Sequence, residues 1–360
     1  MNDFSNLPPK GSSICVALSG GVDSAVSAAI LKEMEYEIVS ATLILCKNAE
    51  NNYAYTSKHS RDDVLKISNR LGIKHFFIDA SDLFKEIVLS DFNNEYEKGR
   101  TPNPCVRCNA LLKWDIIMKK MREIGIHYLA TGHYAGISKI GQNYFISKAC
   151  NETAIDQSYM LWMLDRKYLP YTILPLNSFT KQQVREKAIE YEIEVADKKG
   201  SQDLCFIYKY KYYAKSRLRE ESGNIRLADG TILGRHKGLS RYTVGQRSGL
   251  GLAKGKPLYI VSMDADKNEI KVSFDVNDLK CRKIKAINAN WFNNDDFKEY
   301  HVLTKIRYNS KPVSSLLSRI SENEFTVEFL EQPYAATKGQ SVVCYIDERI
   351  LCGGIINEVE

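Results

Sequence analysis

A glycine turn between an apolar run and a helix-like run carries the strongest chemical signal in the sequence. Residues Ser19–Ser24 read SGGVDS, follow the apolar run Ile14–Leu18 and precede the helix-like run Ala25–Leu31. Adjacent glycines let the backbone approach an anion closely, and the first turn of a helix offers N–H groups and a positive dipole end. The segment predicts a phosphate site rather than a plain structural turn, with Asp23 able to reach a phosphate-bound metal. It lacks the lysine of the GxxxxGK loop, which excludes that kind of nucleotide site.

Three cysteines have neighbours that favour chemistry. Cys105 and Cys108 form a C-x-x-C pair in the segment GRTPNPCVRCN, and Cys205 lies far downstream in GSQDLCFI. Arg100 and Arg107 lie close in sequence to the pair and would favour the reactive thiolate. Three interpretations stay open from the residues alone: half of a zinc site, inert buried cysteine, and redox or sulfur-transfer chemistry between the pair and Cys205. The predicted phosphate-binding loop on the same chain favours the third.

The elements that must position these residues alternate between strand and helix in the first half of the chain. The expected strands after Ile14–Leu18 are Glu37–Leu45, Lys74–Asp79 and His127–Thr131, and the expected helices include Val64–Leu71, Leu111–Ile124 and a capped helix from Thr180 to Tyr191. This alternation predicts a doubly wound parallel sheet of the α/β class. Ligands on such sheets bind at the carboxyl ends of the strands, where SGGVDS and Thr131–Tyr134 would both lie.

The pattern changes after about Cys205. Asp229-Gly230 predicts a type I′ hairpin, and short alternating strands continue to the last residue. We expect three domains: an α/β doubly wound domain over 1–207, a small mixed or β central domain over 208–280, and a C-terminal β-barrel over 281–360.

Bulk composition sets broad limits. The chain has 360 residues, a net charge of +6 and nine cysteines. This mild basic excess is compatible with a nucleic-acid partner. There is no run of about 18 apolar residues and no signal-like N-terminus, so we expect a cytoplasmic protein with reduced thiols and no membrane partner.

SGGVDS resembles the loop of the ATP pyrophosphatases, which transfer AMP to an oxygen. The chain as a whole resembles the tRNA-specific 2-thiouridylases over nearly its full length. The motifs that carry this resemblance, in order, are SGGVDS, GRTPNP-x-x-x-CN (Gly99–Asn109), ATGHY (Ala130–Tyr134), DQSY (Asp156–Tyr159), CFI (Cys205–Ile207), GQRSGLG (Gly245–Gly251), KIRY (Lys305–Tyr308) and KGQS (Lys338–Ser341).

The resemblance implies an ATP-dependent tRNA sulfurtransferase, with 1–207 as its ATP-pyrophosphatase catalytic domain and 208–280 as its tRNA-binding domain. The enzyme would adenylate C2 of the wobble uridine and replace its oxygen with sulfur from a persulfide on Cys205, giving 2-thiouridine. Cys108 would be the nucleophile that releases the sulfur, leaving a Cys108–Cys205 disulfide. A persulfide sulfur-donor protein and a reductant are the implied partners, and ATP and Mg²⁺ the implied small molecules.

The same resemblance assigns binding residues. ATP and Mg²⁺ would be held by Ala17, Leu18, Ser19, Gly20, Gly21, Val22, Asp23, Ser24, Leu43 and Gly132. The flipped-out target base would contact Asn103, Pro104 and Cys105. The tRNA would contact His133, Ile155, Asp156, Gln157, Arg307, Tyr308 and Gln340.

The chain departs from the family pattern at two positions. Family members commonly carry Asp where this chain has Cys105, and Lys where it has Ile155. Three cysteines, Cys105, Cys108 and Cys205, can hold a 4Fe–4S cluster, so a cluster-dependent tRNA thiolase is an alternative. Two further alternatives are an amide-forming adenylating ligase, which would not need Cys108 or Cys205, and a non-catalytic RNA-binding protein, which would not need the intact SGGVDS.

Overall fold

The computed structural model describes residues 6–45, 61–150, 155–194, 221–252, 255–293 and 298–360. The chain divides into two compact units. The first unit takes in 1–88, 105–211 and 348–350, and the second takes in 89–104, 212–347 and 351–360. The segment 89–104 therefore packs with the later part of the chain, although the sequence around it belongs to the first unit.

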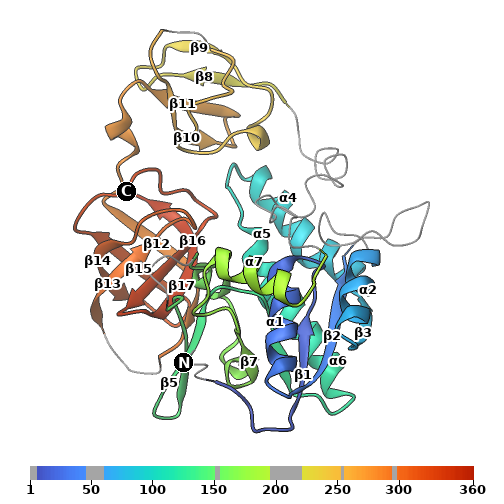
Figure 1. The fold of residues 1–360 in the computed structure, drawn as a ribbon. Helices are drawn as coiled ribbons and strands as arrows, with labels where there is room; N and C mark the ends of the chain where they lie inside the picture. The colour runs from blue at the N-terminus through green and yellow to red at the C-terminus, as the bar shows by residue number, and fades with distance from the viewer. Residues whose placement is uncertain (1–5, 46–60, 151–154, 195–220, 253–254, 294–297) are drawn as a thin grey trace. The chain divides into compact units, whose positions relative to one another are not determined.

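A five-stranded parallel sheet forms the centre of the first unit (Figure 1). In spatial order its strands are β3 (Lys74–Asp79), β2 (Glu37–Ile44), β1 (Ser13–Ala17), β4 (Tyr128–Ala130) and β7 (Thr172–Ile173). The order runs outward from β1 in both directions, so the predicted doubly wound sheet is confirmed. The loops after β1 and β4 lie at the point where the strand order reverses, which is where such sheets bind ligands.

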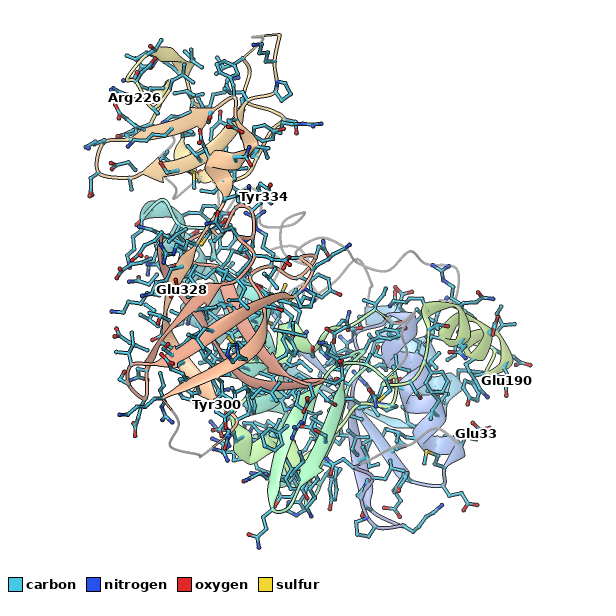
Figure 2. All side chains as sticks on the ribbon, turned by 90° about the vertical axis from the view of Figure 1, so that its left-hand side faces the viewer. Glu33, Glu190, Arg226, Tyr300, Glu328 and Tyr334 are labelled. Carbon is cyan, nitrogen blue, oxygen red and sulfur yellow. The ribbon has the colours of Figure 1, made fainter. Side chains whose placement is uncertain are left out.

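The helices of this unit follow the predicted order. They are α1 (Val22–Glu33), α2 (Arg61–Arg70), the short α3 (Ser81–Leu83), α5 (Pro104–Arg107), α6 (Asp115–Arg122) and α7 (Lys181–Glu190). Helices α1 and α7 share one apolar core, and Figure 2 labels Glu33 and Glu190 at their C-terminal ends. The predicted capping box of Thr180 and Gln183 is present and starts α7 at Lys181. No helix in the described ranges is long and apolar enough to cross a membrane.

The predicted helix over 111–124 is only partly α-helical. A π-helical stretch, Cys108–Trp114, leads directly into α6. Single π-turns inside helices are frequent at functional sites.

The second unit contains α4 (Ser90–Glu97) and a small mixed sheet. In spatial order its strands are β10 (Tyr259–Asp264), β11 (Glu269–Ser273), β8 (Asn224–Arg226) and β9 (Ile232–Arg235). The hairpin predicted at Asp229-Gly230 joins β8 to β9, but the turn type is wrong. Type I′ needs positive φ at both central residues, whereas only Gly230 has it, at +91°.

The C-terminal strands close into a six-stranded barrel, as predicted. Its strands are β12 (Lys283–Trp291), β15 (Glu324–Phe329), β14 (Val313–Arg319), β13 (Glu299–Lys305), β16 (Ser341–Ile346) and β17 (Arg349–Val359), and β12 also pairs with β17. Arg349, at the start of β17, belongs to the first unit and pairs there with Ser147 of the hairpin β5 (Gly136–Ile140) and β6 (Asn143–Ser147).

Candidate functional site

The SGGVDS loop connects β1 to α1. The Ser24 hydroxyl donates to the Gly21 carbonyl at 3.0 Å and accepts from the Ser19 N–H at 3.1 Å, while Gly20 takes φ of +80°. Gly21 begins α1 without a side-chain cap hydrogen bond. The first turn of α1 is therefore presented to the loop without a side-chain oxygen capping it, which suits an anion.

Gly132, just after β4, packs against the start of α1. A side-chain carbon at Gly132 would lie 2.7 Å from both the Asp23 carbonyl carbon and the Ser24 nitrogen. Only glycine fits this approach. The structure thus brings together two segments that the sequence placed separately at the carboxyl edge of the sheet, and Leu43 lies buried in the neighbouring strand β2.

Asp23 is held by two side chains from elsewhere in the unit. The Tyr134 hydroxyl donates to its Oδ1 at 2.7 Å, and the Lys181 ammonium donates to its Oδ2 at 2.6 Å. The same ammonium lies 4.3 Å from the centre of the Tyr134 ring. Sequence reasoning missed Lys181, whose ammonium reaches the lysine-free loop from α7. One signal was available: the capping box places Lys181 in the first turn of its helix, where a cation is disfavoured.

Tyr134 links this loop to another predicted segment. Its N–H donates to Gln157 Oε1 at 3.1 Å, and the Gln157 N–H donates to the Tyr134 carbonyl at 2.7 Å. Burial and the Asp23 carboxylate raise the pKa of Tyr134, so its hydroxyl is a neutral donor. Tyr134 therefore holds Gln157 through its backbone and the Asp23 carboxylate of the loop through its hydroxyl.

The predicted tRNA contacts beside Tyr134 and Gln157 differ in exposure. His133 is half-buried and shares a 2.8 Å hydrogen bond with Thr131; burial, with a contribution from the Lys113 cation, lowers the pKa of His133 to about 3. Its ring is therefore neutral at physiological pH. Ile155 is 42% exposed, and the Asp156 carboxylate accepts from the Ser158 N–H at 3.0 Å.

The C-x-x-C pair lies at the start of the helical segment that becomes α6. Cys108 is buried and Cys105 half-buried. Burial raises the pKa of Cys108, and burial with the Cys108 thiol beside it raises the pKa of Cys105 to about 11. The expectation that Arg100 and Arg107 lower these values is wrong. Desolvation outweighs nearby charge, and the cation that opposes it is Lys113.

A metal ion needs a set of ligand side chains close together. Within the described residues, no three side chains of His, Cys, Asp or Glu come together as a metal site. Cys205 lies outside the described residues, so the three-thiolate cluster and the Cys108–Cys205 disulfide stay predictions.

Comparisons with known proteins cover almost the whole chain. Three family models match in succession: the tRNA methyl transferase HUP domain over 12–209, the tRNA methyl transferase PRC-barrel domain over 211–274 and the aminomethyltransferase beta-barrel domain over 281–356. A tRNA-specific 2-thiouridylase (MnmA 1) of Clostridium botulinum is 38% identical over 354 residues, covering 96% of this chain and 99% of the relative. The chain belongs to the tRNA-specific 2-thiouridylase family.

Two other 2-thiouridylases have similar sequence identity to this chain. The relatives from Halothermothrix orenii and Acetivibrio thermocellus are each 36% identical, covering 96% and 95% of this chain and 99% and 98% of their own lengths. Among solved structures, an NMN synthetase from Francisella tularensis matches with a TM-score of 0.35 and 17% identity, covering 56% of this chain and 73% of its own.

The 2-thiouridylase resemblance also predicts contacts in the second unit, and there the structure gives two predicted side chains internal partners. Gln340 Nε2 donates to the carbonyls of Thr101 and Pro102 at 3.0 and 3.1 Å. Arg307 Nη2 donates to the carbonyls of Val244 and Ala335 at 2.8 and 2.7 Å.

The remaining second-unit candidates for tRNA or base contact differ in burial. Tyr308 is half-buried, with the Lys305 ammonium 5.8 Å from its ring centre. Asn103 is half-buried and Pro104 buried.

Proposed function

We propose that this chain is an ATP-dependent sulfurtransferase that converts a tRNA wobble uridine to 2-thiouridine. The observation that carries the proposal is the near full-length similarity to relatives named tRNA-specific 2-thiouridylase, in a chain that keeps SGGVDS, Cys108 and Cys205. The uncapped start of α1 and the Lys181 ammonium support an anionic ligand at the loop.

ATP would bind with its phosphates at Ser19–Ser24 and its adenosine near Leu43 and Gly132. Magnesium bound with nucleotide phosphates needs one or two protein carboxylates, and Asp23 is the carboxylate of this loop. The residues fit an ion shared by Asp23 and the phosphates, which would neutralise phosphate charge. Lys181, released from Asp23, would then face the pyrophosphate.

The chemistry would proceed in two transfers. The O2 oxygen of the flipped-out uracil attacks the α-phosphorus of ATP, and pyrophosphate leaves. The terminal sulfur of a persulfide on Cys205 then attacks C2, and AMP leaves with the original oxygen. The Cys108 thiolate attacks the Cys205 sulfur, breaking the S–S bond, so that sulfur stays on C2 and a Cys108–Cys205 disulfide forms. A thiol reductant returns both cysteines to thiols.

At the position where family members commonly carry an Asp carboxylate, this chain would place the neutral thiol of Cys105. With a pKa of about 11 it stays protonated at physiological pH, so it can donate a hydrogen bond to the base. A carboxylate in its place would only accept one. Proton removal in this enzyme would therefore not fall to Cys105.

The test is mass spectrometry of nucleosides from tRNA incubated with the protein, ATP, Mg²⁺ and sulfide, beside a Cys205→Ser variant. We expect 2-thiouridine that disappears in the variant. Absence of the product from folded wild-type protein, both as purified and after anaerobic iron–sulfur reconstitution, would refute the proposal and favour an amide-forming ligase.

The C-x-x-C pair makes the cluster-dependent thiolase the second candidate. The described residues supply two of its three thiols. A colourless anaerobic preparation that is fully active without added iron would exclude it, whereas activity that depends on reconstitution would favour it.

A further inference from the structure

The segment Gly99–Pro104 is bound by the C-terminal barrel. The Thr101 N–H donates to the Lys338 carbonyl at 2.9 Å, and Gln340 Nε2 donates to the Thr101 and Pro102 carbonyls. These bonds satisfy the backbone of a segment whose two prolines have no N–H to offer.

A half-buried arginine adds a second set of bonds at the beginning of the segment. Arg100 Nε lies 2.8 Å from Glu95 Oε2, Nη1 donates to Asn357 Oδ1 at 2.9 Å, and Nη2 donates to the Ile356 carbonyl at 3.3 Å. The Arg100 and Glu95 side chains are 16% and 17% exposed, which limits screening by solvent. Arg100 thus connects α4 to the last strand of the barrel.

Gly339 shows how closely the barrel backbone packs against the segment Gly99–Pro104 and helix α4. Its φ is +89°, and a side-chain carbon there would lie 2.9 Å from the Thr101 carbonyl oxygen and 3.0 Å from Glu95 Oε2. The Gly339 N–H donates to the Ile356 carbonyl, and the Ile356 N–H donates to the Gln340 carbonyl, which fixes Gln340 against β17. We call Arg100, Gly339, Gln340 and Asn357 the barrel clasp.

We propose that the barrel clasp positions the target-base segment, with Gln340 and Arg100 as positioning residues for sulfur transfer. This inference rests on the proposed function and on the predicted contact of Asn103 with the flipped-out uracil, after which the chain runs through Pro104 to Cys105. The 89–104 segment belongs to the second unit and Cys105 to the first, so the clasp fixes the last residues before the chain passes to the cysteine pair. The barrel would then contribute to the rate of transfer as well as to tRNA binding.

The first test needs neither tRNA nor ATP. Hydrogen exchange of full-length protein, followed by mass spectrometry of peptides covering 99–104, reports the opening of the clasp. We expect Gln340→Ala to speed this exchange at least tenfold, with no change for Gln332→Ala, a control at an exposed barrel glutamine. Equal exchange in wild type and Gln340→Ala would overturn the inference whether or not the protein thiolates tRNA.

The second test separates positioning from tRNA contact. With the clasp as proposed, Gln340→Ala lowers kcat for thiolation at least tenfold and leaves KM for tRNA within about twofold. A pure tRNA contact would instead raise KM and leave kcat unchanged, which would overturn the inference. Should Gln340→Ala fail to fold, Asn357→Ala removes only one of the three acceptors of Arg100 and should lower kcat by a smaller factor, again with KM for tRNA unchanged. Failure of wild type to make 2-thiouridine would refute the proposed function, while the exchange result still stands.

Discussion

Lys181 gives the sharpest test of the phosphate site. Its ammonium bonds Asp23 at 2.6 Å and lies over the Tyr134 ring, so replacing it with methionine removes the charge but keeps an aliphatic side chain against the ring. If Lys181 faces the pyrophosphate when ATP binds, Lys181→Met loses one charge-assisted hydrogen bond. Such bonds contribute about 1.5–3 kcal/mol, which corresponds to a roughly 10- to 150-fold weaker affinity for ATP.

The same substitution should hardly change stability. The Lys181 and Asp23 side chains are 34% and 27% exposed, so their pair is partly screened and contributes about 0.2–1 kcal/mol. A cation in the first turn of a helix costs about 0.3–1 kcal/mol, and removing it recovers that amount. The two terms offset, so the free energy of unfolding should change by less than about 1 kcal/mol.

The assay is calorimetric titration of ATP with Mg²⁺ into wild type, Lys181→Met and Lys187→Ala, with urea unfolding of each. Lys187 is the matched control: it lies on the same helix and contacts Glu190 and Tyr191 at its far end. An ATP affinity for Lys181→Met within threefold of the control, with the fold intact, would refute the assignment of Lys181 to the phosphates.

Three further outcomes are expected. Tyr134→Phe removes the hydroxyl bond that orients Asp23 but keeps the ring. Because this bond is already made without ATP, the same titration should show ATP affinity lower by at most about 1.5 kcal/mol, roughly tenfold, and unchanged affinity would contradict the orienting role. Because the pKa of Cys105 is raised to about 11, its alkylation by iodoacetamide, resolved by peptide mass spectrometry, should keep rising above pH 9, and a plateau near pH 8.5 would argue against a buried thiol. Burial lowers the pKa of His133 in the folded protein to about 3, whereas in the unfolded chain it is about 6.5. As pH falls below about 6.5 the unfolded chain therefore gains a proton that the folded protein does not, and the free energy of unfolding decreases. Between pH 6.5 and 4, the free energy of unfolding measured in urea should therefore fall less for the His133→Asn variant than for wild type.

Local signals predicted the order of elements well. The apolar run before SGGVDS, the i, i+3, i+4, i+7 spacing in Val64–Leu71 and the capping box at Thr180 each depend on residues within about two turns of one another. Such patterns identify strands, helices and their ends without any knowledge of distant contacts. The hairpin at Asp229-Gly230 was predicted by the same logic, but the identity of two turn residues does not by itself decide between turn types.

The contacts that build the site are long-range, and no local pattern contains them. Lys181 is 158 residues from Asp23, and Gln340 is 239 residues from Thr101. The thiol pKa expectation went wrong for the same reason. Sequence shows which charges are close to Cys108 along the chain, but desolvation depends on everything packed around it.

A local rule broken in the sequence marks the position of Lys181. The capping box fixes the start of α7, so a lysine occupies the first turn at the positive end of the helix dipole, where acidic residues are favoured. Proteins break such preferences mainly at functional or strained sites and compensate elsewhere. Here Asp23 supplies the compensation, and that carboxylate lies in the predicted phosphate loop, which has no lysine of its own. An ATP pyrophosphate arriving at this loop would bring both the negative charge that Lys181 needs and the phosphate oxygens that share a metal ion with Asp23. In the proposed function the ion pair would hold both groups ready, because each would lose its partner only when the ligand replaces it.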